Sequence, residues 1–318
     1  MKEAEILTII KNTLTDSSYI GDDCAFLKDF GLYVTQDSLV EGVHFNLSYM
    51  TPFQLGIKAV TVNVSDLLTA VSMPMYITVG LSLPNTVDEK FVKELYRGID
   101  TACLKYGVKV IGGDITGSEK VVISITAIGK RCFEHGVSRK FAKESDFIIA
   151  TGHFGTASAG LYALENKLSA SKILTDAFLT PEARLPELWK IKYHLDYDIA
   201  STDSSDSLAE SLFQIAEASG VSISVNYSDI PVLPEVREFA KANNLDEKDF
   251  VLWGGEDFEL IFCVQYWAFS TMDTNMFKYI GQVGERTDKP TVTVYDNKSS
   301  VVIDREMTDR KSFDHFGG

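Results

Sequence analysis

The chain has 318 residues, of which 45% are hydrophobic and 24% charged, a composition typical of a globular protein with a sizeable core. Its length allows two domains of ordinary size. The formal net charge is −15, and such a surface repels nucleic acid and anionic membranes. No apolar stretch approaches the roughly 18 residues that span a bilayer. We therefore expect neither nucleic acid nor membrane as a partner.

Cysteine usage indicates the cellular compartment. The chain has four cysteines, which are far apart and form no CxxC pair: Cys24, Cys103, Cys132 and Cys263. This pattern predicts reduced thiols in a cytoplasmic protein and gives no zinc site. The first residues predict an amphipathic helix with Ile6, Ile10 and Leu14 on one face, not a signal peptide.

The first half of the chain alternates expected strands and helices. Residues 31–40 predict a strand that ends near Asp37. Residues 53–71 contain β-branched residues that favour a strand, but their length and polar positions fit a half-buried helix better. After a strand at 76–83, a capping box of Thr86 and Glu89 starts a helix that runs through Tyr106. Residues 108–114 predict a short buried strand ending in a Gly-Gly turn, and residues 121–130 another strand.

The second half follows a polar, basic stretch at residues 131–145. We place a domain boundary there, with an N-terminal domain at 1–135 and a C-terminal domain at 136–318. Strands are expected at 146–152 and 257–264, and helices after residue 153, near Pro181 and at 208–219. The last segments resemble hairpins. Strands and helices mix in both halves, so the expected class is α+β, with mixed α/β layers.

Single aspartates recur at turns and at the ends of expected elements. They are Asp22, Asp23, Asp37, Asp66, Asp114, Asp203 and Asp206. Any one of them could form a turn or cap a helix. Taken together, carboxylates without cysteine or histidine partners favour Mg²⁺. The sequence does not show whether these loops meet, so separate turns and a shared metal cluster remain open alternatives.

Other polar residues allow two interpretations each. His44 could bind a phosphate or a ring, or it could cap a loop. Arg139 belongs to a compact basic cluster that is either solvated or part of a cleft at the domain junction. Glu256 and Asp257 follow Gly-Gly and could simply close a turn. The loop at 151–160 is rich in glycine but lacks the spacing of a phosphate-binding motif. No motif of nucleophilic catalysis occurs.

The motifs in their order resemble one enzyme family. They are IGDDCA, QDSLVEGVHF, KAVTVNVSDL, IGGD, SRKFAKESD, DSSDSL and GGEDFEL. This order is similar to that of thiamine-monophosphate kinase, a member of the aminoimidazole ribonucleotide synthetase superfamily, from about Ile20 to the C-terminal FDHF. The resemblance implies transfer of the γ-phosphoryl group of ATP to thiamine monophosphate. It also implies a homodimer whose N-terminal domains pair through a β-barrel-like interface, with active sites in clefts between the domains.

The resemblance also assigns roles to residues. The implied ligands of several Mg²⁺ ions are Asp23, Thr35, Gln36, Asp37, Asp66, Asp114, Asp203 and Asp206. The implied ATP contacts are Tyr106, Gly113, Asp114, Arg139 and Ser205. The implied substrate contacts are His44, Glu256 and Phe313, and the residues expected to be catalytic are Asp37, Asp114, Arg139 and Asp203. The chain departs from the family at Ser207, where Gly is usual, and at Gln36, where a small hydroxyl residue is usual.

The chemistry suits these residue types. The acceptor is a phosphate whose second pKa is about 6, so no general base is needed. Phosphoryl transfer depends mainly on positioning and electrostatic stabilisation. Two alternatives are an enzyme that activates an amide or acyl oxygen, or selenide, with ATP, and a catalytically silent nucleotide- or metal-binding protein. VEGVHF and the lack of a reactive N-terminal Cys argue against the first, and only Ser207 favours the second.

Overall fold

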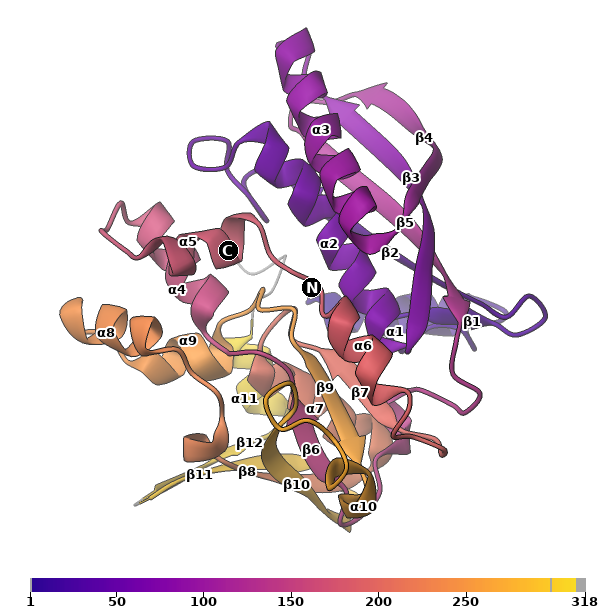
Figure 1. Ribbon diagram of the computed structural model, residues 1–318, viewed down its shortest axis with the longest axis vertical. Coiled ribbons are helices and arrows are strands. Elements are labelled where there is room, and N and C mark those ends of the chain that lie inside the picture. The colour runs from indigo at the N-terminus through magenta and orange to yellow at the C-terminus, as the bar shows by residue number, and fades with distance from the viewer. Residues whose placement is uncertain (1, 298, 313–318) are drawn as a thin grey trace.

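Two mixed layers of strands and helices make up the protein (Figure 1). The computed structural model describes residues 2–297 and 299–312. One sheet is formed by strands before residue 132 and the other by strands after residue 146. The expected α+β class is confirmed. The boundary at residues 135 and 136 falls between the sheets and remains a prediction.

The first sheet has five strands in the order β1-β2-β5-β3-β4. They are β1 (Ala25–Leu27), β2 (Leu32–Val40), β3 (Ser72–Leu83), β4 (Lys109–Gly117) and β5 (Val122–Arg131). Helices α2 (Pro52–Thr69) and α3 (Glu89–Tyr106) pack against each other. A Cβ atom at Gly56 would meet the carbonyl of Leu95, and one at Gly98 would meet that of Phe53. These glycines therefore allow the two helix backbones to approach closely.

The second sheet has seven strands in the order β12-β11-β8-β10-β6-β9-β7. They are β6 (Phe147–Ala150), β7 (Ala200–Asp203), β8 (Val221–Asn226), β9 (Leu260–Val264), β10 (Lys278–Arg286), β11 (Thr291–Asp296) and β12 (Ser299–Ile303). The helices of this half are α4 (Thr156–Glu165), α5 (Lys172–Leu179), α6 (Leu185–Ile191), α7 (Leu208–Ser219), α8 (Pro234–Ala242), α9 (Glu247–Trp253), α10 (Tyr266–Phe269) and α11 (Arg305–Lys311). The 3₁₀ helices are η1 (Arg139–Phe141) and η2 (Tyr227–Asp229).

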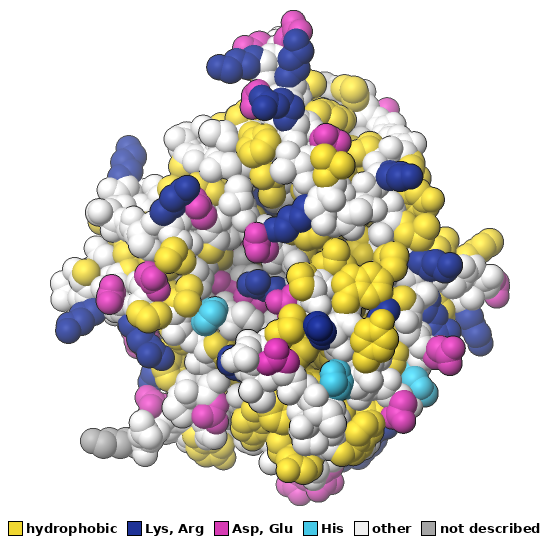
Figure 2. Space-filling view, in the orientation of Figure 1, with side chains coloured by type: hydrophobic (Ala, Val, Ile, Leu, Met, Phe, Trp, Pro, Cys, Tyr) yellow, Lys and Arg dark blue, Asp and Glu magenta, His cyan; other side chains and the backbone are white. Residues whose placement is uncertain are grey.

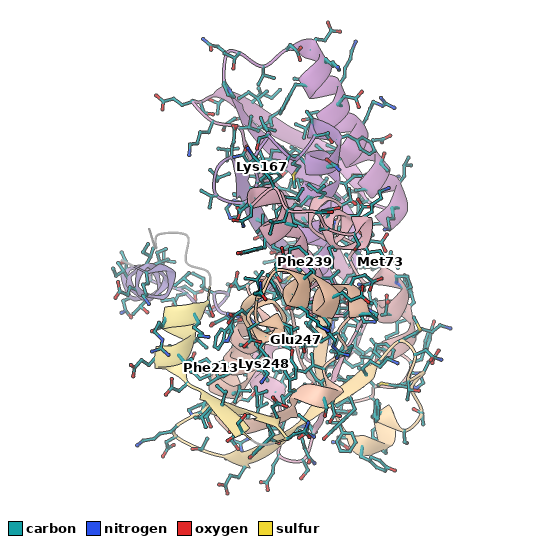
Figure 3. All side chains as sticks on the ribbon, turned by 90° about the vertical axis from the view of Figure 1, so that its left-hand side faces the viewer. Met73, Lys167, Phe213, Phe239, Glu247 and Lys248 are labelled. Carbon is teal, nitrogen blue, oxygen red and sulfur yellow. The ribbon has the colours of Figure 1, made fainter. Side chains whose placement is uncertain are left out.

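Side-chain contacts attach α9 to its surroundings. The rings of Phe239 on α8 and Phe250 on α9 lie 6.0 Å apart. Glu247 accepts a hydrogen bond from the hydroxyl of Tyr227 at 3.0 Å, and Lys248 pairs with Asp296 at 2.6 Å. Figure 3 shows Phe239, Glu247 and Lys248 in the lower half of the molecule, with the first sheet above them.

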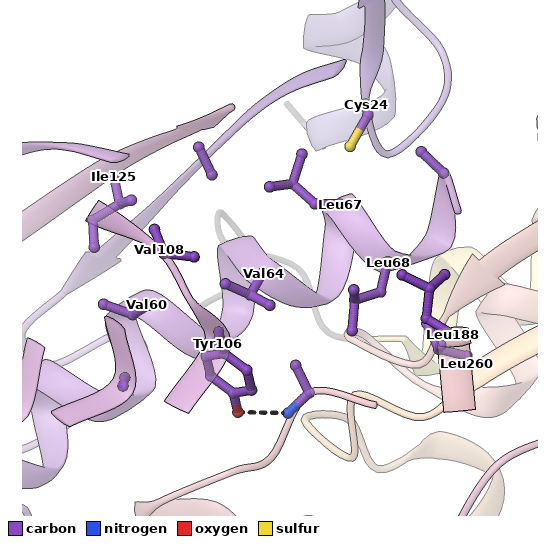
Figure 4. Close-up of a cluster of buried hydrophobic side chains, with 14 of the residues drawn as sticks. Cys24, Val60, Val64, Leu67, Leu68, Tyr106, Val108, Ile125, Leu188 and Leu260 are labelled. Carbon is purple, nitrogen blue, oxygen red and sulfur yellow. Dashed lines mark hydrogen bonds between the residues drawn. The ribbon is translucent and has the colours of Figure 1, made fainter. Parts of the chain in front are cut away.

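Helix α2 joins the two halves. It contacts β2 and β5 of the first sheet and β7 and β9 of the second. Leu68 of α2 belongs to the same buried cluster as Leu188 of α6 and Leu260 of β9 (Figure 4). The hydroxyl of Tyr106 accepts a hydrogen bond from the backbone N–H of Ala183 at 2.9 Å, across the same junction (Figure 4). The core is therefore continuous between the sheets.

Three expected boundaries in the first half are wrong. Asp37 does not end its strand but pairs with Ile125 in the middle of β2. The helix α3 is capped by Asp88, whose side chain accepts from the N–H of Phe91 at 2.8 Å, so Thr86 and Glu89 form no capping box. Strand β4 continues through Gly113 to Gly117 and is exposed along its length, because it is the last strand of the sheet and few side chains cover it.

Two expectations about helices need correction. The helix expected near Pro181 begins at Leu185, with a proline in its first turn, because Pro186 takes the starting position that suits it. The N-terminal helix α1 (Glu3–Thr13) is present, but Ile10 and Leu14 are exposed and bury no apolar face. All four cysteines are free thiols, as expected. Across residues 2–297 and 299–312, no helix combines the length and apolar character of a membrane span.

Ser207 is the N-cap of α7, so it does not distort the loop before that helix. Its φ is −176°, which is extended backbone that any residue adopts. Its hydroxyl accepts from the N–H of Glu210 at 3.1 Å. The departure from Gly at this position therefore adds a capping bond and imposes no strain.

We expect Ser207→Ala to lower the free energy of unfolding by about 1 kcal/mol, and Ser207→Gly by only a few tenths, because the hydroxyl cap is lost in both and Gly tolerates the cap position better. Urea unfolding of both variants measures this. Equal stability of all three proteins would show that the cap contributes nothing.

Candidate active site

Three acids that are distant in the sequence meet at the junction of the two halves. Asp23 precedes β1, Asp66 lies in the last turn of α2, and Asp203 ends β7. One carboxylate oxygen from each lies within 4.8 Å of the others. The structure thus brings together the aspartates of IGDDCA, KAVTVNVSDL and DSSDSL, and these three are called the acid cluster below.

Polar neighbours orient each member of the acid cluster. Thr35 donates its hydroxyl to Asp66 at 2.6 Å, and Ser65 donates its hydroxyl to Asp203. Arg139 forms an ion pair with Asp23. These bonds hold the carboxylates close together despite their like charge.

The electrostatics of the acid cluster would favour the binding of a cation. Burial, followed by the charge of Asp23, raises the pKa of Asp203 to about 8. Burial together with Asp37, Asp203 and Asp23 raises the pKa of Asp66 well above its usual range. Like charges crowded in a buried site disfavour ionisation, and a divalent cation reverses that preference. The carboxylate oxygens of the cluster and the hydroxyl of Thr35 are hard ligands that fit Mg²⁺, while the nearby thiol of Cys24 donates to the backbone carbonyl of Asp66 at 3.2 Å.

Strand β2 presents its expected ligands to opposite faces of the sheet. Thr35 and Asp37 lie on the face toward α2, where the N–H of Asp37 donates to the side chain of Asn63 at 3.0 Å. Gln36 lies on the other face and accepts from the hydroxyl of Thr126 at 2.8 Å, because side chains alternate along a strand. Only the backbone carbonyl of Gln36 could therefore reach a metal bound at the acid cluster.

Gly113 and Asp114 lie apart from the acid cluster. Asp37 pairs with Ile125, Ile125 with Val79, and Val79 with Gly113. This row crosses three strand spacings, so Gly113 lies about 14 Å from Asp37 within the sheet. Asp114 follows on the exposed strand β4. Asp114 is not a member of the acid cluster.

Arg139 begins η1 beside the N-terminal acids. Asp22 accepts from the hydroxyl of Ser138 at 2.8 Å and from the N–H of Arg139 at 3.0 Å. Burial acts to lower the pKa of Arg139, but the ion pair with Asp23 outweighs it, and the pKa is raised. The Nε atom of Arg139 is buried and has no hydrogen-bond partner among the described residues.

The remaining expected residues occupy different settings. Tyr106 is buried and its hydroxyl is occupied by Ala183, so its ring is not open to solvent. His44 accepts from the N–H of Val40 at 3.0 Å, which fits the loop-capping interpretation. Ser205 is exposed just after β7, next to Asp206. Phe313 lies outside the described residues.

One polar residue of the site was not singled out from the sequence. Lys58 of α2 is fully buried and forms an ion pair with Glu256. Burial lowers the pKa of Lys58, although Glu256 acts against this shift. The feature that could have revealed this residue is a lysine inside a helix whose other positions are almost all buried. A single charged residue in such a helix needs a partner, but the sequence does not identify it.

A recess of about 410 Å³ lies between α4, α5 and residues 180–184. Figure 2 shows acidic and basic side chains side by side in a hollow near the middle of this face. Arg184 pairs there with the buried Glu259. Asp257 accepts from the N–H groups of Gly155 at 2.7 Å and Ala157 at 3.0 Å. Burial nevertheless raises the pKa of Asp257 to about 7.

Asp257 should make stability depend on pH. Its carboxyl has a higher pKa in the folded protein, about 7, than the ordinary 3.8. Its contribution is therefore fully present below pH 3.8 and is lost as the pH rises to about 7. We expect the free energy of unfolding of Asp257→Asn to fall less than that of the wild type over this interval. Urea unfolding in EDTA at several pH values measures both slopes, and identical slopes would contradict the assignment.

The comparisons with known proteins agree with one another. The family model of AIR synthase related protein, N-terminal domain, matches residues 21–131. The thiamine-monophosphate kinase of Aquifex aeolicus is 34% identical over 266 residues, covering 82% of this chain and 85% of its own. That of Bacillus subtilis is 31% identical over 341 residues, covering 99% of this chain and 100% of its own.

A solved structure extends the similarity to the fold. AaThiL complexed with AMPPCP and TMP superimposes with a TM-score of 0.86 at 30% sequence identity, covering 99% of this chain and 97% of its own. Sequence identity above 30% over most of the chain, together with this superposition, decides the family. The chain belongs to the thiamine-monophosphate kinase family.

Proposed function

We propose that this protein is an ATP-dependent kinase that transfers the γ-phosphoryl group of ATP to the phosphate of thiamine monophosphate, giving thiamine diphosphate and ADP. The two ligands of one relative support this assignment, since AaThiL is complexed with the ATP analogue AMPPCP and with TMP. The acid cluster of Asp23, Asp66 and Asp203 carries the proposal, because two anionic substrates require cations between them.

The proposed reaction needs no nucleophilic side chain. A phosphate acceptor is largely ionised at neutral pH, and catalysis then consists of positioning and charge stabilisation. The acid cluster, with Asp37 and the hydroxyl of Thr35, would hold Mg²⁺. Bound Mg²⁺ supplies positive charge that offsets the repulsion between the two phosphate groups. Arg139, which carries a permanent positive charge, lies directly beside this site.

The other site assignments stay proposals. They are Asp114 and Asp206 as further metal ligands, Gln36 as a ligand through its backbone, Tyr106, Gly113, Asp114 and Ser205 as ATP contacts, and His44, Glu256 and Phe313 as substrate contacts. We also propose a cytoplasmic location, because the cysteines are unpaired thiols and such thiols persist in a reducing compartment.

We propose that the active form is a homodimer. Strand β4 ends its sheet and exposes three apolar side chains, Val110, Ile111 and Ile115, at 43%, 55% and 72%. An exposed apolar edge strand is a template for pairing with another chain. A dimer formed there would cover this edge. It would also bring the exposed Asp114 close to a second copy of the chain.

The activity test is direct. The purified protein is incubated with ATP, Mg²⁺ and thiamine monophosphate, and the products are separated by chromatography. We expect equal amounts of ADP and thiamine diphosphate, and none with unphosphorylated thiamine, which lacks the ionised acceptor oxygen. Asp37→Asn should lower turnover by at least 100-fold, because a carboxylate beside the acid cluster is lost. Absence of thiamine diphosphate with the wild type, or full activity of Asp37→Asn, would contradict the proposal.

Metal binding is tested separately by thermal unfolding at pH 7. In EDTA we expect Asp66→Asn to have a higher Tm than the wild type, because burial and the neighbouring carboxylates disfavour an ionised Asp66 and raise its pKa well above the usual range, whereas a neutral amide carries no such cost. Addition of Mg²⁺ should raise the Tm of the wild type more than that of Asp66→Asn. A Mg²⁺-induced shift of the same size in both proteins would show that Asp66 holds no metal.

A further inference from the structure

We propose that Lys58 is a positioning residue that fixes one oxygen of the Glu256 carboxylate so that the other oxygen can receive the cationic ring of the acceptor. This inference rests on the proposed function and on Glu256 as a substrate contact. It adds Lys58, the first residue of the KAVTVNVSDL motif, to which the resemblance assigned no role, and it states how that residue acts.

Among the residues that the structure describes, Lys58 has one anionic partner. Its side chain is 0% exposed, and Nζ forms an ion pair with Oε2 of Glu256. Nζ also lies 3.5 Å from the carbonyl oxygen of Phe178 and 3.6 Å from the centre of its ring. The aromatic ring and the carbonyl both attract a cation. Lys58 is thus held from two sides and reaches Glu256 from a fixed position.

The loop of Glu256 is equally constrained. Glu256 adopts a φ of +70°, in the left-handed region that costs a residue with a side chain energy. Its N–H donates to the carbonyl of Ser205 at 2.6 Å. Gly255 lies against the carbonyls of Ser205 and Asp206, with no room for a Cβ atom. With the backbone fixed, the lysine contact decides where the carboxylate points.

The exposed fractions of Lys58 and Glu256 show that part of the Glu256 carboxylate remains accessible to a ligand. The side chain of Glu256 is 24% exposed, whereas that of Lys58 is fully covered. One carboxylate offers two oxygens, so a cation can approach the side opposite the lysine. The thiazolium ring of thiamine monophosphate carries such a positive charge. A purely structural contact at this place could be made by apolar side chains with no loss of stability.

The position of Lys58 on α2 gives the arrangement a defined spacing. Asp66, a member of the acid cluster, lies eight positions further along the same helix, which corresponds to about 12 Å. The residue that orients Glu256 and the residue that would hold metal at the phosphate therefore belong to one rigid element. Helix α2 would set the distance between the sites for the cationic and anionic ends of the acceptor.

The test uses the full chain and steady-state kinetics for both substrates. The variants are Lys58→Met, which keeps length over the Phe178 ring without charge, Glu256→Gln, and the double variant. We expect Lys58→Met to raise KM for thiamine monophosphate at least tenfold, as for loss of a charged hydrogen bond, with KM for ATP within twofold of the wild type. The double variant should match Glu256→Gln, because Lys58 acts through Glu256.

A control variant separates positioning from stability. Ser72→Ala removes a buried hydroxyl that donates to the carbonyl of Leu67 at 2.7 Å, so it should lower Tm without changing KM for either substrate. If Lys58→Met does not fold, the double variant still tests the role of Lys58, because it buries no unpaired charge. A KM for thiamine monophosphate clearly above that of Glu256→Gln would overturn the inference.

Two further results would also overturn the proposed role of Lys58. One is an unchanged KM for thiamine monophosphate in Lys58→Met, and the other is an equal rise of KM for both substrates. The wild type in the same assay tests the proposed function independently. An inactive wild type overturns that function, whereas an active wild type with either result above overturns the role of Lys58 alone.

Discussion

The proposed chemistry depends on three carboxylates of like charge that the fold holds close together. Asp23, Asp66 and Asp203 come from a loop, a helix end and a strand end, and their oxygens lie within 4.8 Å of one another. Such an arrangement costs free energy in the bare protein, since burial and mutual repulsion raise the pKa of Asp203 to about 8. A cation bound between the three carboxylates would offset this cost in free energy. This is the physical basis of the proposed kinase chemistry.

Helix α2 is the element that makes this arrangement possible. It is buried along almost its whole length and contacts both sheets. Its polar residues each have a defined partner, as Asn63 has in Asp37 and Lys58 in Glu256. A helix packed on all sides moves little, so the groups it carries keep their spacing. The proposed acceptor and metal sites therefore share one rigid reference.

Buried charged pairs recur where loops of the second half meet the rest of the molecule. Arg139 binds Asp23, Lys58 binds Glu256 and Arg184 binds Glu259. Each pair joins segments that are far apart in the sequence. Separating the two members of a buried pair would leave an uncompensated charge in the interior. These contacts therefore fix the relative placement of the segments. Their positions beside the acid cluster and the recess link the geometry of the site to the fold.

The sequence alone determined the class of fold, the family and the type of chemistry, because these follow from composition and from the local order of motifs such as IGDDCA and GGEDFEL. It could not determine that β4 is exposed, that Asp37 lies in mid-strand, or that Asp88 caps α3, since neighbouring strands and local hydrogen bonds decide these points. Nor could it join Lys58 to Glu256 or show that Asp114 lies outside the acid cluster. Contacts between residues so distant in the chain arise only when the two sheets pack around α2, and only the tertiary structure decided them.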